Sequence, residues 1–228
     1  RLSLVGSEMC IRDSAWSAGA TSGFEEAVAL VIDGGGSFGW QLEAGERAAC
    51  LRFEPTMCEH LSIYRWSGGE AVSLEKQLSF MPYLADPRPG AMPPFASLGH
   101  MYSSAALQIF GDYHAAGKVM ALAAFGRPIH PPSDFFELEG PELRFRDVVP
   151  ARYRHARRWP REEAAYRDLA ASVQNALEEA LLAVRDRVRS LAGPDRLCYA
   201  GGVALNGLAN RHVLLDGAFE DVHVVPFA

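Results

Sequence analysis

The sequence predicts an α/β fold in which helices flank a mixed β-sheet, and three observations support this class. Ala27–Asp33 and Leu197–Ala200 are short, nearly continuous apolar runs, as expected of strands covered on both faces. Arg161–Ala192 repeats apolar residues at helical spacing and carries its charges elsewhere. Along the chain, a meander of strands is followed by helices and then by strand–helix–strand, an order that favours a mixed sheet.

The composition narrows the possible partners. The chain has 228 residues and a formal net charge of −6, a balance that disfavours a general nucleic-acid partner. Its apolar runs are too short for a membrane-spanning helix, so we expect no membrane partner. The cysteines are scattered without a Cys-x-x-Cys pair, which argues against a disulfide scaffold or a zinc site and favours a reducing cytoplasm.

Residues 1–14 read RLSLVGSEMCIRDS, and this string lacks a clear helical or strand period. It resembles the translated read-through of sequencing adapters. We therefore exclude it from fold reasoning and expect genuine sequence from residue 15, the alternative being a real disordered start. Since a strand also lies at the other end, we expect a fragment cut at both ends.

The first half predicts a meander followed by helices. After Ala27–Asp33, further strands are expected at Phe38–Leu42, Ala49–Phe53, Glu59–Trp66 and Ala71–Leu74. The proline-rich stretch Pro82–Pro94 predicts an irregular connection. Helices are expected from Leu98 to a stop at Gly111, and at Lys118–Phe125.

The second half predicts a loop over residues 129–160 and then the long helix Arg161–Ala192. Strand Leu197–Ala200, helix Val203–Leu215 and strand Val222–Val225 follow. We expect Ala27–Asp33 and Leu197–Ala200 to be adjacent central strands. By analogy with known folds, this order is that of a ribonuclease-H-like lobe, two of which form the actin-like ATPase fold, so the chain corresponds to about one lobe.

Asp33 ends an apolar strand and is followed by Gly34, Gly35 and Gly36. Glycines let backbone N–H groups approach a phosphate, and a carboxylate at a strand end can hold a metal ion. We expect Asp33, Gly34 and Gly35 to contact a nucleotide, with Asp33 as a metal ligand. The alternative is an Asp-Gly hairpin turn without a ligand.

A second glycine turn follows Leu197–Ala200, in the segment AGGVALN. If a helix begins after Gly201 and Gly202, its free N–H groups and positive dipole end suit a phosphate. Asn206, one turn into that helix, could reach a ribose or a phosphate. The alternative is a tight strand-to-helix turn with a structural asparagine. We expect both glycine turns to meet at one edge of the sheet and to form a nucleotide cleft.

The segment GKVMALAAFG (117–126) contains Lys118, one of two lysines in the chain. Lys118 could pair with a phosphate; alternatively it is a solvated lysine on the first turn of a helix. Arginines concentrate in residues 144–167 with interleaved aromatics, which could indicate RNA binding, although a solvated face explains them more simply.

Together these motifs resemble the O-carbamoyltransferase family, which includes the nodulation-factor enzymes and the cephalosporin and tobramycin carbamoyltransferases. The matching stretches occur in family order: TSGFEEAVALVIDGGGS (21–37), SLGHMYSSA (97–105), GKVMALAAFG (117–126) and LCYAGGVALNGLANRHVLLDGAFEDVHVVPFA (197–228). The chain departs from the family at Gly207, often Cys, and at Ala121, often Gly, and its connection between Trp40 and Pro94 is longer.

The resemblance implies that residues 15–228 are part of the family's actin-like domain, mostly its second lobe. A separate C-terminal domain, absent here, would make carbamoyl adenylate from carbamoyl phosphate and ATP. The actin-like domain would then transfer the carbamoyl group to a hydroxyl of a small molecule or glycan. Gly202 and Asn206 match positions that hold the adenylate. By itself the chain is expected to be inactive.

The resemblance also implies a metal, with iron expected, bound by two histidines, the Asp matching Asp33, and a further Asp after the last strand. The histidines would fall at Cys10 and Ser14, within the segment set aside above. We therefore predict that the intact gene encodes His at both positions.

Three other functions compete with this reading. A tRNA threonylcarbamoyl-transfer relative would use the arginine-rich segment on RNA, with steep salt dependence. A sugar or acetate kinase would use the glycine turns for ATP. A non-enzymatic lobe would serve as a binding module.

Overall fold

The computed structural model describes residues 11–81, 95–146, 159–191, 193, 195–214 and 217–225. The chain divides into two compact units. The sheet unit consists of Arg1–Phe80, Val188–Leu205 and Phe219–Ala228, and the helical unit of Met81–Arg187 and Asn206–Ala218. None of the helices in the described ranges is long and apolar enough to cross a membrane.

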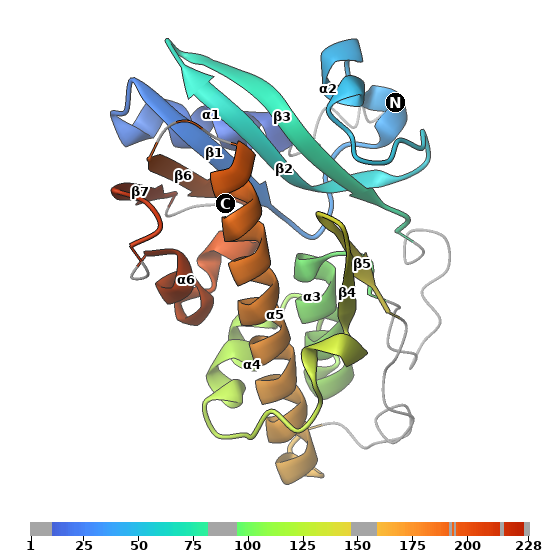
Figure 1. Cartoon of the computed structure of the whole chain (residues 1–228). Helices are drawn as coiled ribbons and strands as arrows, with labels where there is room; N and C mark the ends of the chain where they lie inside the picture. Colours follow the sequence, from blue (N-terminus) through green and yellow to red (C-terminus); the bar gives the residue numbers. More distant parts are fainter. Residues whose placement is uncertain are drawn as a thin grey trace, which may run out of the picture. The chain divides into compact units, whose positions relative to one another are not determined.

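The sheet unit is built on one five-stranded mixed sheet (Figure 1). Its strand order is β3-β2-β1-β6-β7, and neighbours are antiparallel on the β3–β2–β1 side and parallel on the β1–β6–β7 side. The predicted adjacency of the two apolar strands is confirmed, because β1 and β6 pair in the centre. The strands are β1 Glu26–Ile32, β2 Cys58–Ser67, β3 Glu70–Ser79, β6 Arg196–Ala200 and β7 Asp221–Val224.

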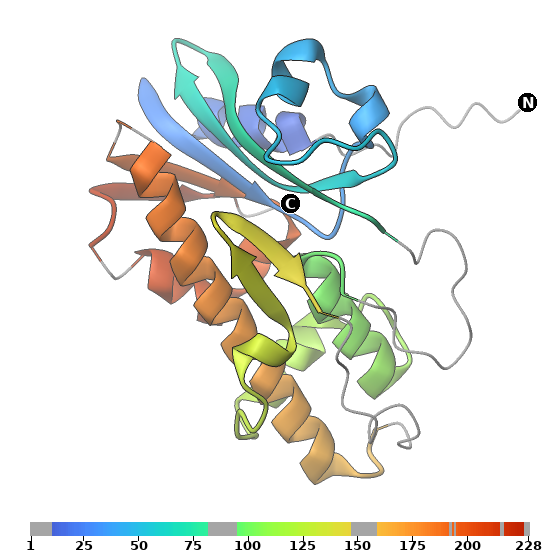
Figure 2. The same cartoon turned by 45° about the vertical axis from the view of Figure 1, so that its right-hand side comes forward.

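Helix α1, Ile11–Ser22, lies across one face of this sheet (Figures 1 and 2). Ile11, Ala15 and Ala18 of the helix are buried against β1, β2 and β6 side chains such as Val31, Trp66 and Cys198. Residues 11–14, which were set aside from fold reasoning, form the first turn of α1. Its period is hard to see in the sequence because, apart from Ile11, the buried side is made of the small residues Ala15, Ala18 and Gly19. The origin of residues 1–14 stays a prediction.

Two of the predicted strands are wrong. Phe38–Leu42 contains a 3-10 helix, Gly39–Gln41, and only Phe38 makes an isolated bridge, to Cys58. Ala49–Phe53 directly follows the short helix α2, Ala44–Ala48, and only Cys50 makes an isolated bridge, to Lys76. Local side-chain bonds explain the difference. Gln41 Oε1 accepts from the Phe38 N–H at 2.6 Å, and Glu46 Oε2 from the Glu43 N–H at 3.1 Å, so helical turns replace strand pairing.

The helical unit contains the predicted helices and one unpredicted hairpin. Ser97 caps α3 by accepting from the His100 N–H at 2.9 Å, and Gly111 ends it with φ 72°. The hairpin falls inside the predicted loop, where its two short strands turn at Gly140, which has φ 60°. The elements are α3 Leu98–Phe110, α4 Ala116–Ala123, a 3-10 helix Pro132–Asp134, β4 Phe136–Glu139, β5 Glu142–Phe145, α5 Glu163–Leu191 and α6 Gly207–Leu214. The stretch Pro82–Pro94 lies outside the described residues.

Helix α5 confirms the long predicted helix, and its last residues, from Val188, belong to the sheet unit. The helix predicted from Val203 is wrong at its start. A 3-10 helix, Gly202–Leu205, comes first, and α6 begins only at Gly207. The mixed α/β class with flanking helices is thus confirmed, while the likeness to an actin-like lobe stays a prediction.

Candidate functional site

The two glycine turns lie at the same edge of the sheet unit. Strands β1 and β6 are parallel neighbours, with Val28 opposite Leu197 and Val31 opposite Ala200. Their carboxyl ends therefore coincide, and the residues that follow them, Asp33 and Gly201, are brought together. Edges of this kind are where open α/β sheets place ligand-binding groups.

Asp33 joins the two turns through its carboxylate. Its Oδ2 accepts from the Gly202 N–H at 3.2 Å, and its Oδ1 accepts from the Gly34 N–H at 2.6 Å. Asp33 is half-buried, whereas Gly35 and Gly202 are exposed. The hairpin alternative is excluded, because β1 is followed by a long connection that contains α2 before β2 begins.

Gly201 is required by its close approach to β1. Its φ is +92°, and a Cβ at this position would lie 2.3 Å from the carbonyl oxygen of Ile32. No side chain fits there without moving a central strand, so the turn after β6 depends on glycine. Its carbonyl then accepts from the Ala204 N–H at 2.8 Å, which starts the 3-10 helix.

Backbone hydrogen bonds to β2 hold the turn after β1 in place. The Asp33 N–H donates to the His60 carbonyl at 2.9 Å, and the Gly36 N–H to the Glu59 carbonyl at 2.7 Å. Pairing of β2 with β3 is irregular between Glu59 and Leu61, which places His60 at the irregularity. His60 is fully buried, and burial lowers the pKa of its imidazole to about 3, so the ring is neutral.

Next to this turn, β2 and β3 contain a buried charged cluster that was not predicted from the sequence. Lys76 Nζ contacts Glu59 Oε2 at 2.6 Å and the Tyr64 hydroxyl at 2.7 Å, and all three side chains are inaccessible to water. Burial by itself would lower the pKa of Lys76, but the charge of Glu59 and the Tyr64 hydroxyl outweigh it and raise the pKa. The only signal in the sequence is a lysine in the middle of an otherwise half-apolar strand.

The Asn206 side chain is fixed by hydrogen bonds within the protein, and the residue does not lie one turn into a helix as predicted. It precedes α6, and its Oδ1 accepts from the Ala209 N–H at 3.0 Å, the usual bond of a helix N-cap. Its side-chain amide also exchanges two hydrogen bonds with Gln174, at 3.0 and 3.2 Å. The structural alternative for Asn206 therefore has direct support, and its contact with an adenylate stays a prediction.

Lys118 belongs to the helical unit, whereas Asp33, Gly34, Gly35, Gly201 and Gly202 belong to the sheet unit. It is exposed, and its ammonium lies 5.8 Å from the centre of the Phe110 ring. Within the described ranges, the arginine-rich segment is partly paired, with Arg144 contacting Glu139 at 2.6 Å and Arg167 contacting Glu163. Residues 147–158 lie outside the described part.

The described residues do not fit a metal centre. They contain no group of three or more His, Cys, Asp and Glu side chains placed to hold an ion, and Asp33 already accepts two backbone hydrogen bonds. Cys10, one of the expected histidine positions, lies outside the described residues, while Ser14 lies within α1. The assignment of Asp33 as a metal ligand stays a prediction.

Comparison with known families tests the resemblance stated above. Residues 8–228 match the family described as carbamoyltransferase N-terminus. This chain belongs to that family. The match begins inside the segment 1–14 and includes both glycine turns and the 117–126 motif. It confirms the carbamoyltransferase resemblance and disfavours a kinase.

Two relatives are nodulation proteins. The chain is 30% identical over 224 residues to nodulation protein NolNO of Sinorhizobium fredii, covering 94% of this chain and 28% of that protein. It is also 30% identical over 221 residues to nodulation protein NolO of Bradyrhizobium diazoefficiens, covering 93% of this chain and 34% of that protein. A third, an uncharacterized protein of Synechocystis, is 41% identical over 61 residues, 27% of this chain and 10% of that protein. The chain thus spans about a third of the length of the nodulation proteins it matches.

Proposed function

We propose that this chain is part of an O-carbamoyltransferase whose glycine turns hold carbamoyl adenylate, made from carbamoyl phosphate and ATP by another domain. The acceptor is a hydroxyl group of a small molecule or a glycan. Membership of the carbamoyltransferase N-terminus family supports the reaction class. The rest of the proposal concerns the donor and where it binds.

One observation carries the binding site. The Gly202 N–H lies 3.2 Å from Asp33 Oδ2, so two turns that are far apart in the sequence share one carboxylate at the exposed edge of parallel strands. Glycines leave these turns without side chains that would block a ligand, and Gly35 and Gly202 are exposed. A phosphate and its attached carbamoyl group would be held by backbone groups of these turns.

The reaction is an acyl transfer. The acceptor oxygen attacks the carbamoyl carbonyl carbon, the bond from that carbon to the phosphate oxygen breaks, and AMP leaves with the electron pair while the hydroxyl proton passes to solvent. Backbone N–H groups near the carbonyl would stabilise the negative charge that develops on it. The metal expected for the family stays a proposal that requires ligands besides Asp33.

The charge of Asp33 has a consequence for binding. Its carboxylate occupies the N–H groups of Gly34 and Gly202, which a phosphate would otherwise use. An adenylate phosphate in the turns would also meet a like charge at short range. Neutralising this carboxylate should therefore strengthen nucleotide binding in a metal-free buffer.

The first prediction tests the site with AMP, the leaving group of the proposed reaction. Isothermal titration in a metal-free buffer should show AMP binding, tighter for Asp33→Asn than for wild type. Gly202→Leu should weaken binding at least about tenfold, because the new side chain stands at the exposed position beside Asp33. Gly207→Leu is the matched control, since a Cβ at Gly207 meets no atom within 4 Å.

Thermal unfolding of each variant checks that it is folded. The proposal fails if neither wild type nor Asp33→Asn binds AMP. It also fails if, in the Asp33→Asn background, the Gly202→Leu variant binds AMP as tightly as the Gly207→Leu variant does.

A further inference from the structure

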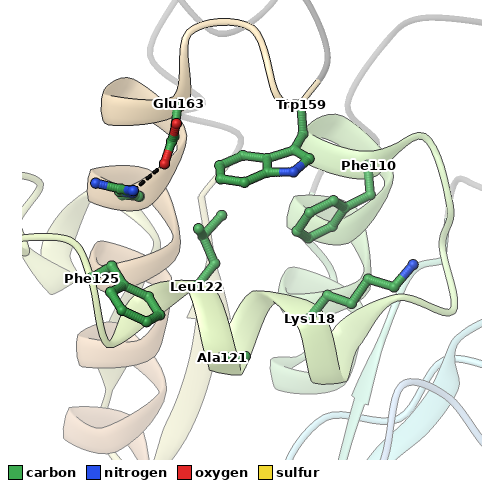
Figure 3. Close-up of a pocket in the computed structure, with 8 residues that line it drawn as sticks. Phe110, Lys118, Ala121, Leu122, Phe125, Trp159 and Glu163 are labelled. Carbon is green, nitrogen blue, oxygen red and sulfur yellow. Dashed lines mark hydrogen bonds and ion pairs between the residues drawn. The ribbon is translucent and has the colours of Figure 1, made fainter.

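The motif at residues 117–126 lines a pocket in the helical unit. Lys118, Ala121, Leu122 and Phe125 follow the i, i+3, i+4, i+7 spacing of one helix face, and all four border a pocket of about 360 Å³ (Figure 3). The remaining lining residues are Phe110, Trp159, Glu163 and Arg167, so α3, α4 and the start of α5 all contribute. The glycine turns take no part in it.

Three of the eight lining residues are aromatic: Phe110, Phe125 and Trp159. The Phe110 and Trp159 rings meet edge to face with centroids 6.1 Å apart, and Figure 3 shows the Trp159 ring beside Phe110 and above Leu122. Phe125, on the other side of Leu122, is 72% exposed, so its ring is accessible to a ligand. Such a wall suits a flat apolar ligand, because rings gain from stacked and edge-to-face contacts.

Contacts of backbone groups between the contributing elements hold the pocket in shape. A Cβ at Gly126 would lie 1.9 Å from the carbonyl oxygen of Arg167, so only glycine lets the end of α4 approach α5 this closely. The Arg127 N–H donates to Asp168 Oδ1 at 2.9 Å, and the Trp159 N–H to the Ile109 carbonyl at 3.0 Å. These contacts fix the three contributing elements against one another.

The charges at the pocket leave one cation in excess. Arg167 is paired with Glu163 and lies over the Phe125 ring, with 5.9 Å to its centroid. No carboxylate of the described residues pairs with Lys118, whose ammonium lies over the Phe110 ring. Since Arg167 and Glu163 cancel, the lining residues that the structure describes carry a net charge of +1 from Lys118. It is therefore complementary to a ligand with one negative charge.

We propose that this pocket binds a small aromatic carboxylate, with its ring against Phe110, Trp159 and Phe125 and its carboxylate at Lys118. A carboxylate matches a single cation better than a phosphate monoester, which carries close to two charges at neutral pH. The volume lies near the lower end of the range for small-molecule pockets, about 300–1,000 Å³, so a ligand of one or two fused rings fits. None of the pocket's lining residues belongs to the glycine turns proposed for carbamoyl adenylate.

The second prediction uses 2-naphthoate as the probe and uncharged 2-naphthamide as its matched control, with isothermal titration as the readout. The naphthoate should bind roughly tenfold more tightly than the amide, because only the carboxylate gains a charged hydrogen bond. Lys118→Gln should remove that difference and leave amide binding unchanged. Ala121→Trp, which fills the pocket from an exposed position, should remove binding of both.

Arg65→Gln controls for the loss of a positive charge, since Arg65 is exposed on β2 in the sheet unit and should leave both affinities unchanged. Equal affinity of wild type for the two probes, or unchanged naphthoate binding in folded Lys118→Gln, would overturn the proposal. AMP binding is tested at Gly202 and naphthoate binding at Lys118, so either proposal can fail without the other.

Discussion

Lys76 and Glu59 are opposite charges that water does not reach. Both side chains are 0% exposed, and Ser62 adds a hydrogen bond to Glu59 Oε2 at 3.1 Å. Removing two charges from water is costly, and a buried pair recovers that cost only through close contact and added hydrogen bonds. Glu59 also provides the carbonyl that binds Gly36, so the pair lies directly beneath the turn after β1.

The third prediction follows from this pair. Lys76→Met should lower the free energy of unfolding by about 3–5 kcal/mol, because Glu59 would remain buried without its cation. The double variant Lys76→Met/Glu59→Gln should recover part of the loss, since the buried charge is then gone. Urea unfolding of wild type, both single variants and the double variant measures the coupling. A double variant less stable than Lys76→Met would contradict the explanation.

The pKa of Lys76 sets the pH range of this effect. Its folded-state pKa is raised above the ordinary 10.5, so its contribution is fully present below pH 10.5 and is lost only as the pH rises through the higher folded-state value. The loss in Lys76→Met should therefore be the same at about pH 7 and about pH 9.

Single residues differ in how well the sequence reveals them. The meeting of Asp33 with Gly202 could be predicted, because two apolar runs implied neighbouring parallel strands whose ends coincide. The burial of Lys76 could not, because it depends on the register that sets Lys76 opposite Ser62 and near Glu59 across β2 and β3. A sequence shows which residues alternate but not which register two strands adopt.

At the scale of elements, a network of polar side chains fixes the start of α6. Gln174 of α5 exchanges hydrogen bonds with Asn206, accepts one from the Tyr102 hydroxyl of α3, and donates one to Glu178 Oε1 at 2.8 Å. The N-terminus of α6 is thereby tied to α5 and α3 within the helical unit. Asn206 thus ends the 3-10 helix and fixes where α6 starts.

The fourth prediction separates the two roles of Asn206. Asn206→Ala should lower the free energy of unfolding by about 1–2 kcal/mol, since the cap bond to Ala209 is lost and Gln174 loses a partner. Asn206→Asp should cost less, because aspartate is an equally good N-cap. Urea unfolding gives both values. If Asn206→Asp is as unstable as Asn206→Ala, the N-cap hydrogen bond is not the way in which Asn206 stabilises the protein.

The elements that sequence reasoning missed share a physical cause. The hairpin β4–β5 has strands of four residues among prolines, too short for a clear period. In residues 38–53, strand-forming side chains are overruled by bonds from Gln41 and Glu46 to nearby N–H groups. β1 and β6 were predictable because burial on both faces gives continuous apolar runs, and α5 because its buried face repeats over many turns.

At the scale of the whole molecule, neither unit is one continuous stretch of chain. The sheet unit takes three segments and the helical unit two. The central pair β1–β6 joins residues far apart in the sequence, as the 169-residue separation of Asp33 and Gly202 shows. Pairings this distant form late and slowly, because the intervening chain must first be confined.

The fifth prediction concerns the first segment alone. Residues 11–80 contain α1 and β1–β3 but not β6, so one edge of β1 would lack its partner although Val28–Ile32 are 0–2% exposed in the whole chain. An unpaired apolar edge favours aggregation over folding. The segment should show no cooperative urea transition and no dispersed NMR spectrum, whereas the whole chain should show both. A cooperative transition in the segment would contradict this view.

The contrast between the two lysines has a practical consequence for chemical labelling. Lys76 is sealed in the sheet unit and held in its protonated, non-nucleophilic form, while Lys118 is exposed at the rim of the aromatic pocket. An amine-specific reagent therefore meets a single reactive side-chain amine in this chain, apart from the terminal amine. A dye or cross-linker attached there would stand beside the Phe110 ring, so that the folded chain itself directs conjugation to one place.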